Sequence, residues 1–416
     1  MLPTSRTKSL HDPYAAFRHA NYRYYTFGNF LSVIGQQMLR LAVGWKIYQQ
    51  THSMFALGLV GLFIWIPIFF FMIPGGAVAD RFNRKTIVLF CNLLYALSAV
   101  GLALAPILPY SIPLMYSLLF ITGFNRAFCD PARQALLPQL VPQKDFTNAI
   151  TWNSSIFQVA SVVGPALGGL VYALIGYSRV CGLDVLLELA FFAAVLAIRQ
   201  ERPVFKREPL NLDSLLTGLR FVRKNHLILA TITMDLFVVL LGGAVAMLPA
   251  FAEDVLHCGS VGLGWLQAAP PLGAFVTSML LAHHGPMKKA GRTLLWAVAG
   301  FGAATIVFGL SHWFWLSFLM MVVTGALDLI SVIVRSTLVQ VLTPDSMRGR
   351  VNAVSYIFIH SSNELGGFES GATAALFGLI PSVIFGGMGS ILVVLGVTVL
   401  WPQVAKLGSL QSPTKK

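Results

Sequence analysis

Twelve stretches of mostly apolar residues follow one another along this chain of 416 residues. A membrane-spanning helix needs about 20 such residues. The chain is 56% hydrophobic and 11% charged, whereas a soluble domain is about 25% charged. The sequence therefore predicts an all-α polytopic membrane protein with twelve transmembrane helices. The expected spans cover residues 24–48, 54–79, 86–107, 112–131, 148–176, 180–199, 226–252, 260–284, 291–310, 313–341, 350–378 and 381–404.

The basic residues lie on one side of the predicted membrane. The six loops that join an odd-numbered span to the next even-numbered span contain a single basic residue, Arg179. The other loops and both termini are rich in lysine and arginine. Because positively charged loops remain on the cytoplasmic side, we predict a multi-pass protein of the inner cell membrane with both termini in the cytoplasm.

Several functional classes are not indicated by the composition. The net charge of +13 is spread between apolar runs and builds no basic face, so nucleic acid is not an expected partner. The four cysteines have neither metal-ligand spacing nor a disulfide pattern. No glycine-rich loop followed by Lys-Ser or Lys-Thr is present, and no nucleophile–base arrangement stands out. We expect no metal, no cofactor and no enzymatic activity.

One long polar loop, residues 200–225, divides the chain near its middle. We expect a first six-helix bundle at 1–199 and a second at 226–416, the latter with a cytoplasmic tail. Within the loop, "NLDSLLTGLRFVRKNH" places leucine and valine at helical spacing and basic residues on the other side. This pattern predicts an amphipathic helix on the anionic inner membrane surface. A solvated linker is the alternative.

The two halves of the chain resemble each other. Four features recur 202 residues later, namely Thr122-Gly123 as Thr324-Gly325, Arg133 as Arg335, Pro142 as Pro344 and Gly164 as Gly366. A parallel repeat of six spans is typical of transporters whose two bundles enclose a central site. We therefore predict two pseudo-symmetric six-helix bundles. Because each bundle finds its partner in the same chain, we expect a monomer.

A dense charge cluster follows the uncharged second span in "GGAVADRFNRK". An unpaired carboxylate is costly at the membrane boundary, so we expect Asp80 to contact the N-terminus of a helix in the opposite bundle, where the helix dipole favours an anion. Arg81, Arg84 and Lys85 are expected to hold the loop to lipid headgroups or to acidic residues of span four, with Asp130 as the candidate. Such a latch would form only when the cytoplasmic side is closed, and would bias one of two global states.

The spacing Gly76-x-x-x-Asp80-Arg81-x-x-Arg84-Lys85 is similar to the loop 2–3 signature of the major facilitator superfamily. That family usually has glycine where this chain has Asn83. Asparagine tolerates the left-handed backbone, so the tight turn is expected to persist. The resemblance implies twelve helices and transport by alternating access, with spans one, four, seven and ten around the cavity.

Two further stretches resemble motifs of exporters in this superfamily. "SVVGPALGGLV" in span five, with Gly164, Pro165, Gly168 and Gly169, is similar to a Gly-Pro…Gly-Gly motif found mainly in proton-coupled antiporters. Proline kinks a helix and glycines permit close packing; plain tight packing is the alternative. "DPARQALLPQLVP" resembles the end of span four in the branch that holds the enterobactin exporter and macrolide-type efflux proteins. The Arg-x-x-Gln-Gly motif of drug antiporters is not reproduced at Arg126.

Ionisable residues inside the spans are costly and are therefore functional candidates. Arg40, Arg126, Asp235 and Asp328 lie on the four spans that the resemblance places around the cavity. We predict that these four and Glu364 contact substrate or protons. For each of them, a buried structural ion pair is the alternative. Arg335 lies seven residues after Asp328, on the same helix face, and an internal structural pair is expected for it. Asp184 and Glu188 share one face of span six.

Together these patterns predict a secondary transporter that exports an amphipathic small molecule, a drug or a siderophore-like compound, by proton-coupled antiport. Its expected partners are the substrate, protons and membrane lipids. Acids outnumber bases within the spans, which favours proton coupling or a cationic substrate. Arg40 and Arg126 leave an anionic substrate open. Uptake, lipid movement between leaflets, and a receptor or enzyme that reuses the scaffold remain alternatives.

Overall fold

The computed structural model describes residues 12–199, 212–283 and 289–408, which are almost entirely helical and contain no strand. The first half forms six long helices: α1 Ala20–Thr51, α2 Met54–Arg81, α3 Arg84–Leu104, α4 Ser111–Leu136, α5 Phe146–Ile175 and α6 Tyr177–Leu196. The second half contains α8 His226–Leu241, α10 Gly259–His283, α11 Ala290–Leu310, α12 Phe314–Leu342, α13 Asp345–Phe377 and α14 Leu379–Leu400. The shorter elements are η1 Ala15–Arg18, η2 Ala105–Ile107, η3 Leu137–Gln139, η4 Gln143–Asp145, α7 Leu212–Lys224, η5 Ala244–Met247, α9 Leu248–Ala250, the π-helix η6 Phe251–Val255 and α15 Pro402–Ala405.

Nine helical segments within these ranges are long and apolar enough to cross a membrane. The other three long helices, α1, α6 and α13, are more polar or carry more charged residues, such as Arg40, Glu188 and Glu364. Even the 20-residue α6 spans about 30 Å, the thickness of the hydrocarbon core. The prediction of an all-α membrane protein is confirmed, and twelve long helices follow the predicted pattern.

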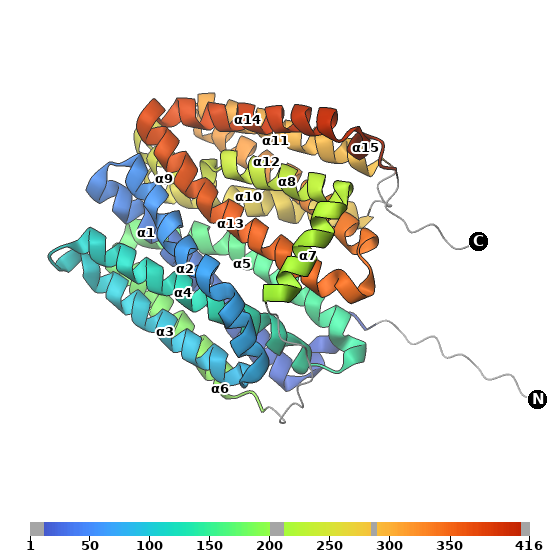
Figure 1. Ribbon diagram of the computed structural model, residues 1–416. Coiled ribbons are helices and arrows are strands. Elements are labelled where there is room, and N and C mark those ends of the chain that lie inside the picture. The colour runs from blue at the N-terminus through green and yellow to red at the C-terminus, as the bar shows by residue number, and fades with distance from the viewer. Residues whose placement is uncertain (1–11, 200–211, 284–288, 409–416) are drawn as a thin grey trace, which may run out of the picture.

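The long helices pack as two bundles, with α1–α6 in the lower part of Figure 1 and α8–α14 in the upper part. The repeat is visible in their packing. Gly123 of α4 lies against the Ile64 carbonyl of α2, and Gly325 of α12 lies against the Pro270 carbonyl of α10. The predicted pseudo-symmetry therefore extends to equivalent close contacts in both halves.

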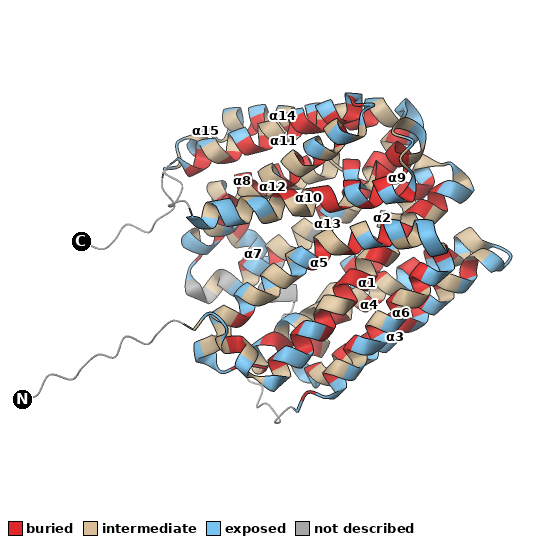
Figure 2. Cartoon of the chain, turned by 180° about the vertical axis from the view of Figure 1, so that it is seen from behind, coloured by how far each residue is buried: buried red, intermediate tan, exposed pale blue. Residues whose placement is uncertain are grey.

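We name the two ends of the bundles by what lies there. The end near residues 12 and 408, where α7 also lies, is called the termini face; the opposite end is the far face (Figure 1). In Figure 2, many buried residues lie inside each bundle, while the outward surfaces of the long helices show many exposed and intermediate residues.

Span seven differs from the single helix that the sequence predicts. α8 ends at Leu241, and the chain passes through Gly242 and Gly243 before it continues as η5, α9 and η6. A Cβ on Gly243 would lie only 2.5 Å from the carbonyl oxygen of Gly366 in α13. Glycine is required at this approach because any side chain would collide with the neighbouring backbone. Helix seven is therefore discontinuous at mid-length.

The chain is helical as α7 in the part of the central loop where the sequence predicts an amphipathic helix. Val222 is buried and packs with Ile228, Val339 and Val351 of the second bundle. Arg220, Arg223 and Lys224 are exposed. Residues 200–211, the first part of the predicted linker, lie outside the described residues, and the exact domain limits remain predictions.

At the far face, the two bundles meet through glycine. A Cβ on Gly61 of α2 would lie 2.5 Å from the carbonyl oxygen of Glu364 in α13. A Cβ on Gly169 of α5 would lie 2.2 Å from the carbonyl oxygen of Ser260 in α10. Such approaches are possible only without side chains. The pairs α2–α13 and α5–α10 therefore close the interface at this end.

Side chains also pack between the two bundles near the far face. One apolar cluster near the far face joins the bundles, with Leu41, Trp45, Tyr48 and Leu57 against Leu248, Phe251, Leu263 and Phe308 among its members. Tyr48 also donates a hydrogen bond to the Asp254 carboxylate. Toward the termini face, the apolar clusters of the described residues each belong to one bundle. Among the described residues, the apolar packing between the two bundles is therefore concentrated toward the far face.

We predict that Gly169→Leu prevents closure of the far face, because the new side chain would push α5 away from the Ser260 carbonyl. A cysteine at Leu57, which is 4% exposed, serves as the reporter. Its labelling by a membrane-impermeant maleimide should rise severalfold in the variant. Cys258 is first replaced by serine, although burial raises the pKa of this loop thiol to about 11 and so slows its reaction.

The matched control is Gly182→Leu in α6, because a Cβ at Gly182 meets no atom within 4 Å. This variant should label like the parent protein. Equal labelling of Leu57→Cys in the Gly169→Leu and Gly182→Leu backgrounds would contradict the role given to the α5–α10 contact.

Candidate functional site

The two bundles are joined near their middle by an ion pair. Arg126 of α4 and Glu364 of α13 lie with Nη1 and Oε1 3.0 Å apart, and the arginine donates a hydrogen bond. Their side chains are 17% and 15% exposed, so the pair is only partly desolvated. Among the described residues, this is the ion pair that connects the bundles. The sequence named both residues as candidates but gave no sign that they would pair.

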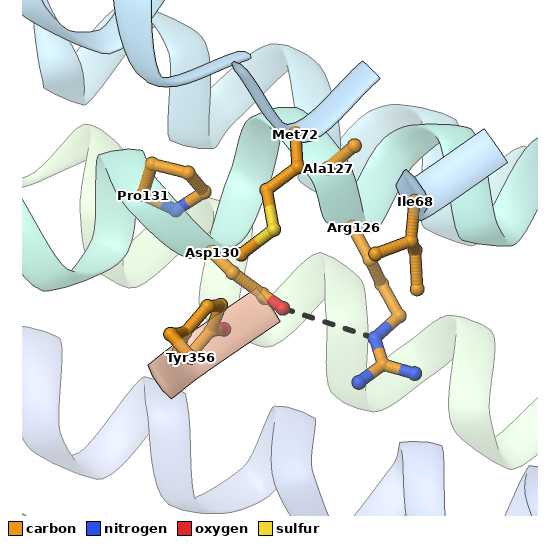
Figure 3. A pocket seen from close by; sticks show the side chains of 7 residues that line it. All are labelled: Ile68, Met72, Arg126, Ala127, Asp130, Pro131 and Tyr356. Atoms are coloured by element: carbon orange, nitrogen blue, oxygen red, sulfur yellow. Dashed lines mark ion pairs between the residues drawn. The ribbon is translucent and has the colours of Figure 1, made fainter. Parts of the chain in front are cut away.

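A small hollow lies beside this pair and is shown in Figure 3. Asp130, one turn after Arg126, places Oδ2 3.8 Å from the arginine Nε. Tyr356 reaches the hollow from α13 of the opposite bundle, and Ile68, Met72, Ala127 and Pro131 complete the lining. The hollow measures about 10 Å³, which is about the room that one water molecule needs. It is a polar junction between the bundles and too small to enclose a substrate.

Arg40 lies on the same level of the molecule. It belongs to the interior of α1, yet its side chain is exposed. Arg126 and Glu364 are both within its electrostatic reach. No hydrogen bond or ion pair joins Arg40 to another described residue. Its positive charge is therefore available beside the bridge between the bundles.

Asp328 occupies the equivalent position in the second half. It lies in the interior of α12, 202 residues after Arg126, and its side chain is exposed. In the part of the chain that the structure describes, Asp328 makes no ion pair and no hydrogen bond. The repeat therefore places a cation in α4 and an unpaired carboxylate in α12.

Asp235 and Arg335 are brought together in a different place. The Arg335 guanidinium of α12 forms an ion pair with the Asp235 carboxylate of α8, and the two side chains are 8% and 9% exposed. The structural pair expected for Arg335 is thus made with another helix. Asp328 lies seven residues away, a rise of about 10 Å, which is too long for direct contact. Asp235, a predicted substrate contact, is instead paired with Arg335 inside the second bundle.

The loop between α2 and α3 is held by helix ends. Arg84 is buried and donates to the Ala135 carbonyl at 3.0 Å. Lys85 donates to the Leu196 and Ile198 carbonyls at 2.9 and 2.8 Å. Helix C-termini carry free carbonyls and partial negative charge, which favour cations. Both residues thereby tie the loop to α4 and α6 of their own bundle.

The remaining parts of the predicted latch are arranged differently from the expectation. Asp130 lies beside Arg126 rather than at the basic residues of the loop. Asp80 is half-buried with no ion pair among the described residues, Gly76 is buried and Arg81 is exposed. The latch was expected only in a state closed at this face, and the apolar cluster that joins the bundles lies toward the opposite face.

Asn83 also differs from the expectation. Its φ is −64°, so the backbone is not left-handed, and its side chain accepts a hydrogen bond from the Lys85 amide at 2.9 Å. Asparagine therefore caps the N-terminus of α3. The turn needs no glycine in this chain.

The four residues of the span-five motif, Gly164, Pro165, Gly168 and Gly169, contact two different helices. Gly164 and Gly168 pack against α1, since their Cβ positions would lie 2.7 Å from Gln37 Cβ and 2.9 Å from Met38 Cα. Pro165 and Gly169 face α10 of the opposite bundle, where both meet Gly264. The motif thus binds α5 to its own bundle and to the partner bundle at once.

A buried polar cluster in the first bundle was not predicted from the sequence. Arg133 donates to the Asn92 side chain at 3.0 Å, and Glu188 accepts hydrogen bonds from Ser32 and Gln36, each at 2.8 Å. The recurrence of Arg133 as Arg335 was the available signal. Its partners could not be recognised because they come from three other helices.

Comparisons with known proteins agree with this architecture. A sequence profile of the family described as transmembrane secretion effector matches residues 11–412. The chain is 27% identical over 376 residues to the enterobactin exporter of Citrobacter koseri, which covers 90% of both proteins. It is also 27% identical over 386 residues to that of Escherichia coli, covering 92% of this chain and 91% of the relative.

Solved structures share the fold at low sequence identity. A POT family transporter in complex with 5-aminolevulinic acid has a TM-score of 0.74 and 13% identity, covering 93% of this chain and 97% of that one. A bacterial homologue of the iron transporter ferroportin in the inward-facing state has a TM-score of 0.70 and 15% identity, covering 93% and 99%. These likenesses concern the fold alone.

We predict that the Arg126–Glu364 pair stabilises contact between the bundles. Arg126→Gln or Glu364→Gln leaves one charge without its partner and should lower the melting temperature of the purified protein. The double variant Arg126→Glu, Glu364→Arg restores opposite charges and should recover part of the loss. A coupling energy of about 1–3 kcal/mol is expected for residues in direct contact.

The control is the exposed pair Arg18–Asp12, whose arginine side chain is 78% exposed. Arg18→Gln should change the stability by about 0–1 kcal/mol, as for other surface ion pairs. Additive effects of the Arg126 and Glu364 substitutions would show that the two residues are not coupled.

Proposed function

Because the chain belongs to the transmembrane secretion effector family of major facilitator transporters, we propose that it exports an amphipathic small molecule across the inner membrane in exchange for protons. Two of its relatives are named enterobactin exporters. This similarity supports transport out of the cell.

The exposed carboxylate of Asp328 is the observation that carries the proposal. The repeat relates Asp328 to Arg126, so we infer that it faces the cavity from the second bundle. Around that cavity, two cations, Arg40 and Arg126, meet three carboxylates, Asp130, Asp328 and Glu364. The carboxylates therefore outnumber the cations by one, which leaves one negative charge without compensation. A proton or a cationic group of the substrate would supply the compensating positive charge, and competition between the two for one carboxylate is the basis of exchange.

The arrangement of the bundles supports loading from the termini face. By the distribution of basic residues, this face is the cytoplasmic one. The glycine contacts at the far face close the route to the outside. For release, the α2–α13 and α5–α10 contacts separate, and the Arg126–Glu364 pair must give way.

An anionic, siderophore-like substrate is the second candidate. Arg40 is exposed and has no partner among the described residues, so it can bind an acidic group together with Arg126. The membrane potential contributes about 2.3 kcal/mol per charge for each 100 mV. Because the cell interior is negative, an anion would be driven outward without any proton exchange. The two candidates therefore differ in their driving force.

The test uses purified protein in liposomes with an imposed pH gradient or an imposed membrane potential. The panel contains cationic dyes, antibiotics and catecholates. For a cationic compound, we expect gradient-driven movement in the wild type. In Asp328→Asn, this movement should fall by about tenfold, a barrier change of about 1.4 kcal/mol, and should become insensitive to pH. Glu369→Gln, on α13, is the matched control and should retain the movement.

Movement of a catecholate that follows the membrane potential and ignores the pH gradient would reject proton exchange and support the anionic candidate. Retained pH-dependent movement in Asp328→Asn would reject the role of that carboxylate. No movement of any compound, with labelled phospholipids added to the panel, would reject export of amphipathic molecules.

A substitution at Arg40 distinguishes the cationic from the anionic substrate in a binding measurement, without a transport assay. Arg40→Gln should weaken binding of a catecholate by about tenfold or more, because a charged hydrogen bond contributes about 1.5–3 kcal/mol. Binding of a cationic dye should be unchanged or tighter, since a repulsive charge is removed. Both are measured by fluorescence quenching in detergent, with Arg18→Gln as the control. Equal loss of both ligands would instead indicate a general structural role for Arg40.

A further inference from the structure

Two acids are buried side by side in the first bundle, away from the cavity. Asp184 is 1% exposed and Glu188 is 0% exposed. They lie four residues apart on α6, hence on one helix face and about 6 Å apart along the axis. α6 packs against α1 and α3 of the same bundle. The proposed exchange of substrate and protons in the cavity makes no use of this pair.

The hydrogen bonds of the two carboxylates are incomplete. Glu188 Oε1 accepts from Ser32 and Gln36 of α1, but its Oε2 has no partner among the described residues. Asp184 Oδ1 also lacks a donor, and it lies where a Cβ on Gly35 of α1 would be, only 2.4 Å away. Two buried carboxylate oxygens without donors are costly, because desolvation of each charge is not repaid.

The charges nearby do not balance. Arg133 of α4 is the cation within electrostatic reach of Glu188, and its guanidinium also lies 4.8 Å from the centre of the Phe191 ring. The cluster therefore contains one arginine for two acids, and the charged group in reach of Asp184 is Glu188. Cys129 on α4 lies in reach of Glu188 and Cys181 on α6 in reach of Asp184, while Tyr25 on α1 and Tyr95 on α3 lie near Arg133. Thiols and phenols carry no positive charge, so they cannot compensate the second carboxylate.

The second bundle provides an internal comparison. Arg335, the repeat counterpart of Arg133, pairs with one carboxylate, Asp235. In that bundle the buried charges cancel. In the first bundle, two buried acids lie on one face of α6 and one arginine, at the same repeat position, is near Glu188, so the equivalent site has an excess negative charge.

We propose that Asp184 and Glu188 form a proton-binding site that holds one proton at neutral pH. The proton cancels the excess charge, and the resulting carboxylic O–H supplies a donor where two carboxylate oxygens have none. A metal cation is less suitable because it needs several further oxygen ligands, and the Ser32 hydroxyl already takes part in hydrogen bonds. No group of three or more potential metal ligands occurs in the described residues.

This site is separate from the cavity and does not rest on the proposed substrate exchange. It lies at the α1–α6 contact within one bundle, whereas Arg126 and Glu364 join the two bundles. Loss of the proton would place two negative charges against α1, Asp184 at Gly35 and Glu188 at Ser32 and Gln36. Protonation is thereby linked to the packing of the helix that also carries Arg40.

The test is infrared spectroscopy of the purified full-length protein in lipid nanodiscs, in sodium-free buffer near neutral pH. Protonated carboxyl groups give a carbonyl stretching band distinct from that of carboxylates. We expect the wild-type spectrum to contain one carboxyl more than Asp184→Asn. Asparagine copies the size of the protonated group, so this variant should fold. Glu188→Gln should shift the same band, and Asp235→Asn, which removes an ionised partner of Arg335, should leave it in place.

A second measurement keeps the proposal testable if one variant expresses poorly. The wild type should lose thermal stability as the pH is raised and the proton is released, and Asp184→Asn should lose less. An unchanged carboxyl band in both Asp184→Asn and Glu188→Gln would overturn the proposal. So would a band that disappears on addition of sodium chloride but not choline chloride, because the site would then bind sodium in place of the proton.

Discussion

The contact between the two bundles is the constraint on which the rest of the structure depends. Between apolar helices in lipid there is no hydrophobic driving force, so close packing and polar contacts must hold them together. Here glycine permits backbone contact at α2–α13 and α5–α10 on the far face, and Arg126 and Glu364 form a charged bridge near the middle. A shared apolar cluster, with Trp45 and Tyr48 packed with Phe251, adds side-chain contacts at the far face.

The repeat supplies one scaffold with different charges in its two halves. Gly123 and Gly325 make equivalent helix contacts, which preserves the packing. At the functional level the halves diverge. Arg126 corresponds to Asp328, and Arg40 corresponds by the same offset to Gly242, where span seven is broken. Internal symmetry thus preserves the helix packing, while the charged residues differ between the two halves.

Local patterns in the sequence were enough to predict the helices, because apolar runs and their polar breaks are short-range signals. They were also enough to predict the repeat and to single out Arg40, Arg126 and Glu364 as unusual. The pairing of Arg126 with Glu364 could not be predicted, because 238 positions separate them and no periodicity connects α4 with α13. The partners of Arg84 and Lys85 were missed for another reason. They are backbone carbonyls at helix ends, and every residue offers one, so no side chain marks them.

The central claim is that the bundles move as two rigid units, closed at one face when open at the other. Its most direct test is double electron–electron resonance on the protein in nanodiscs, with one pair of spin labels across each face. At neutral pH, the far-face distance should be short and the termini-face distance long. Acidification or substrate should lengthen the first distance and shorten the second together. Two distances that stay constant, or that change in the same direction, would contradict the account.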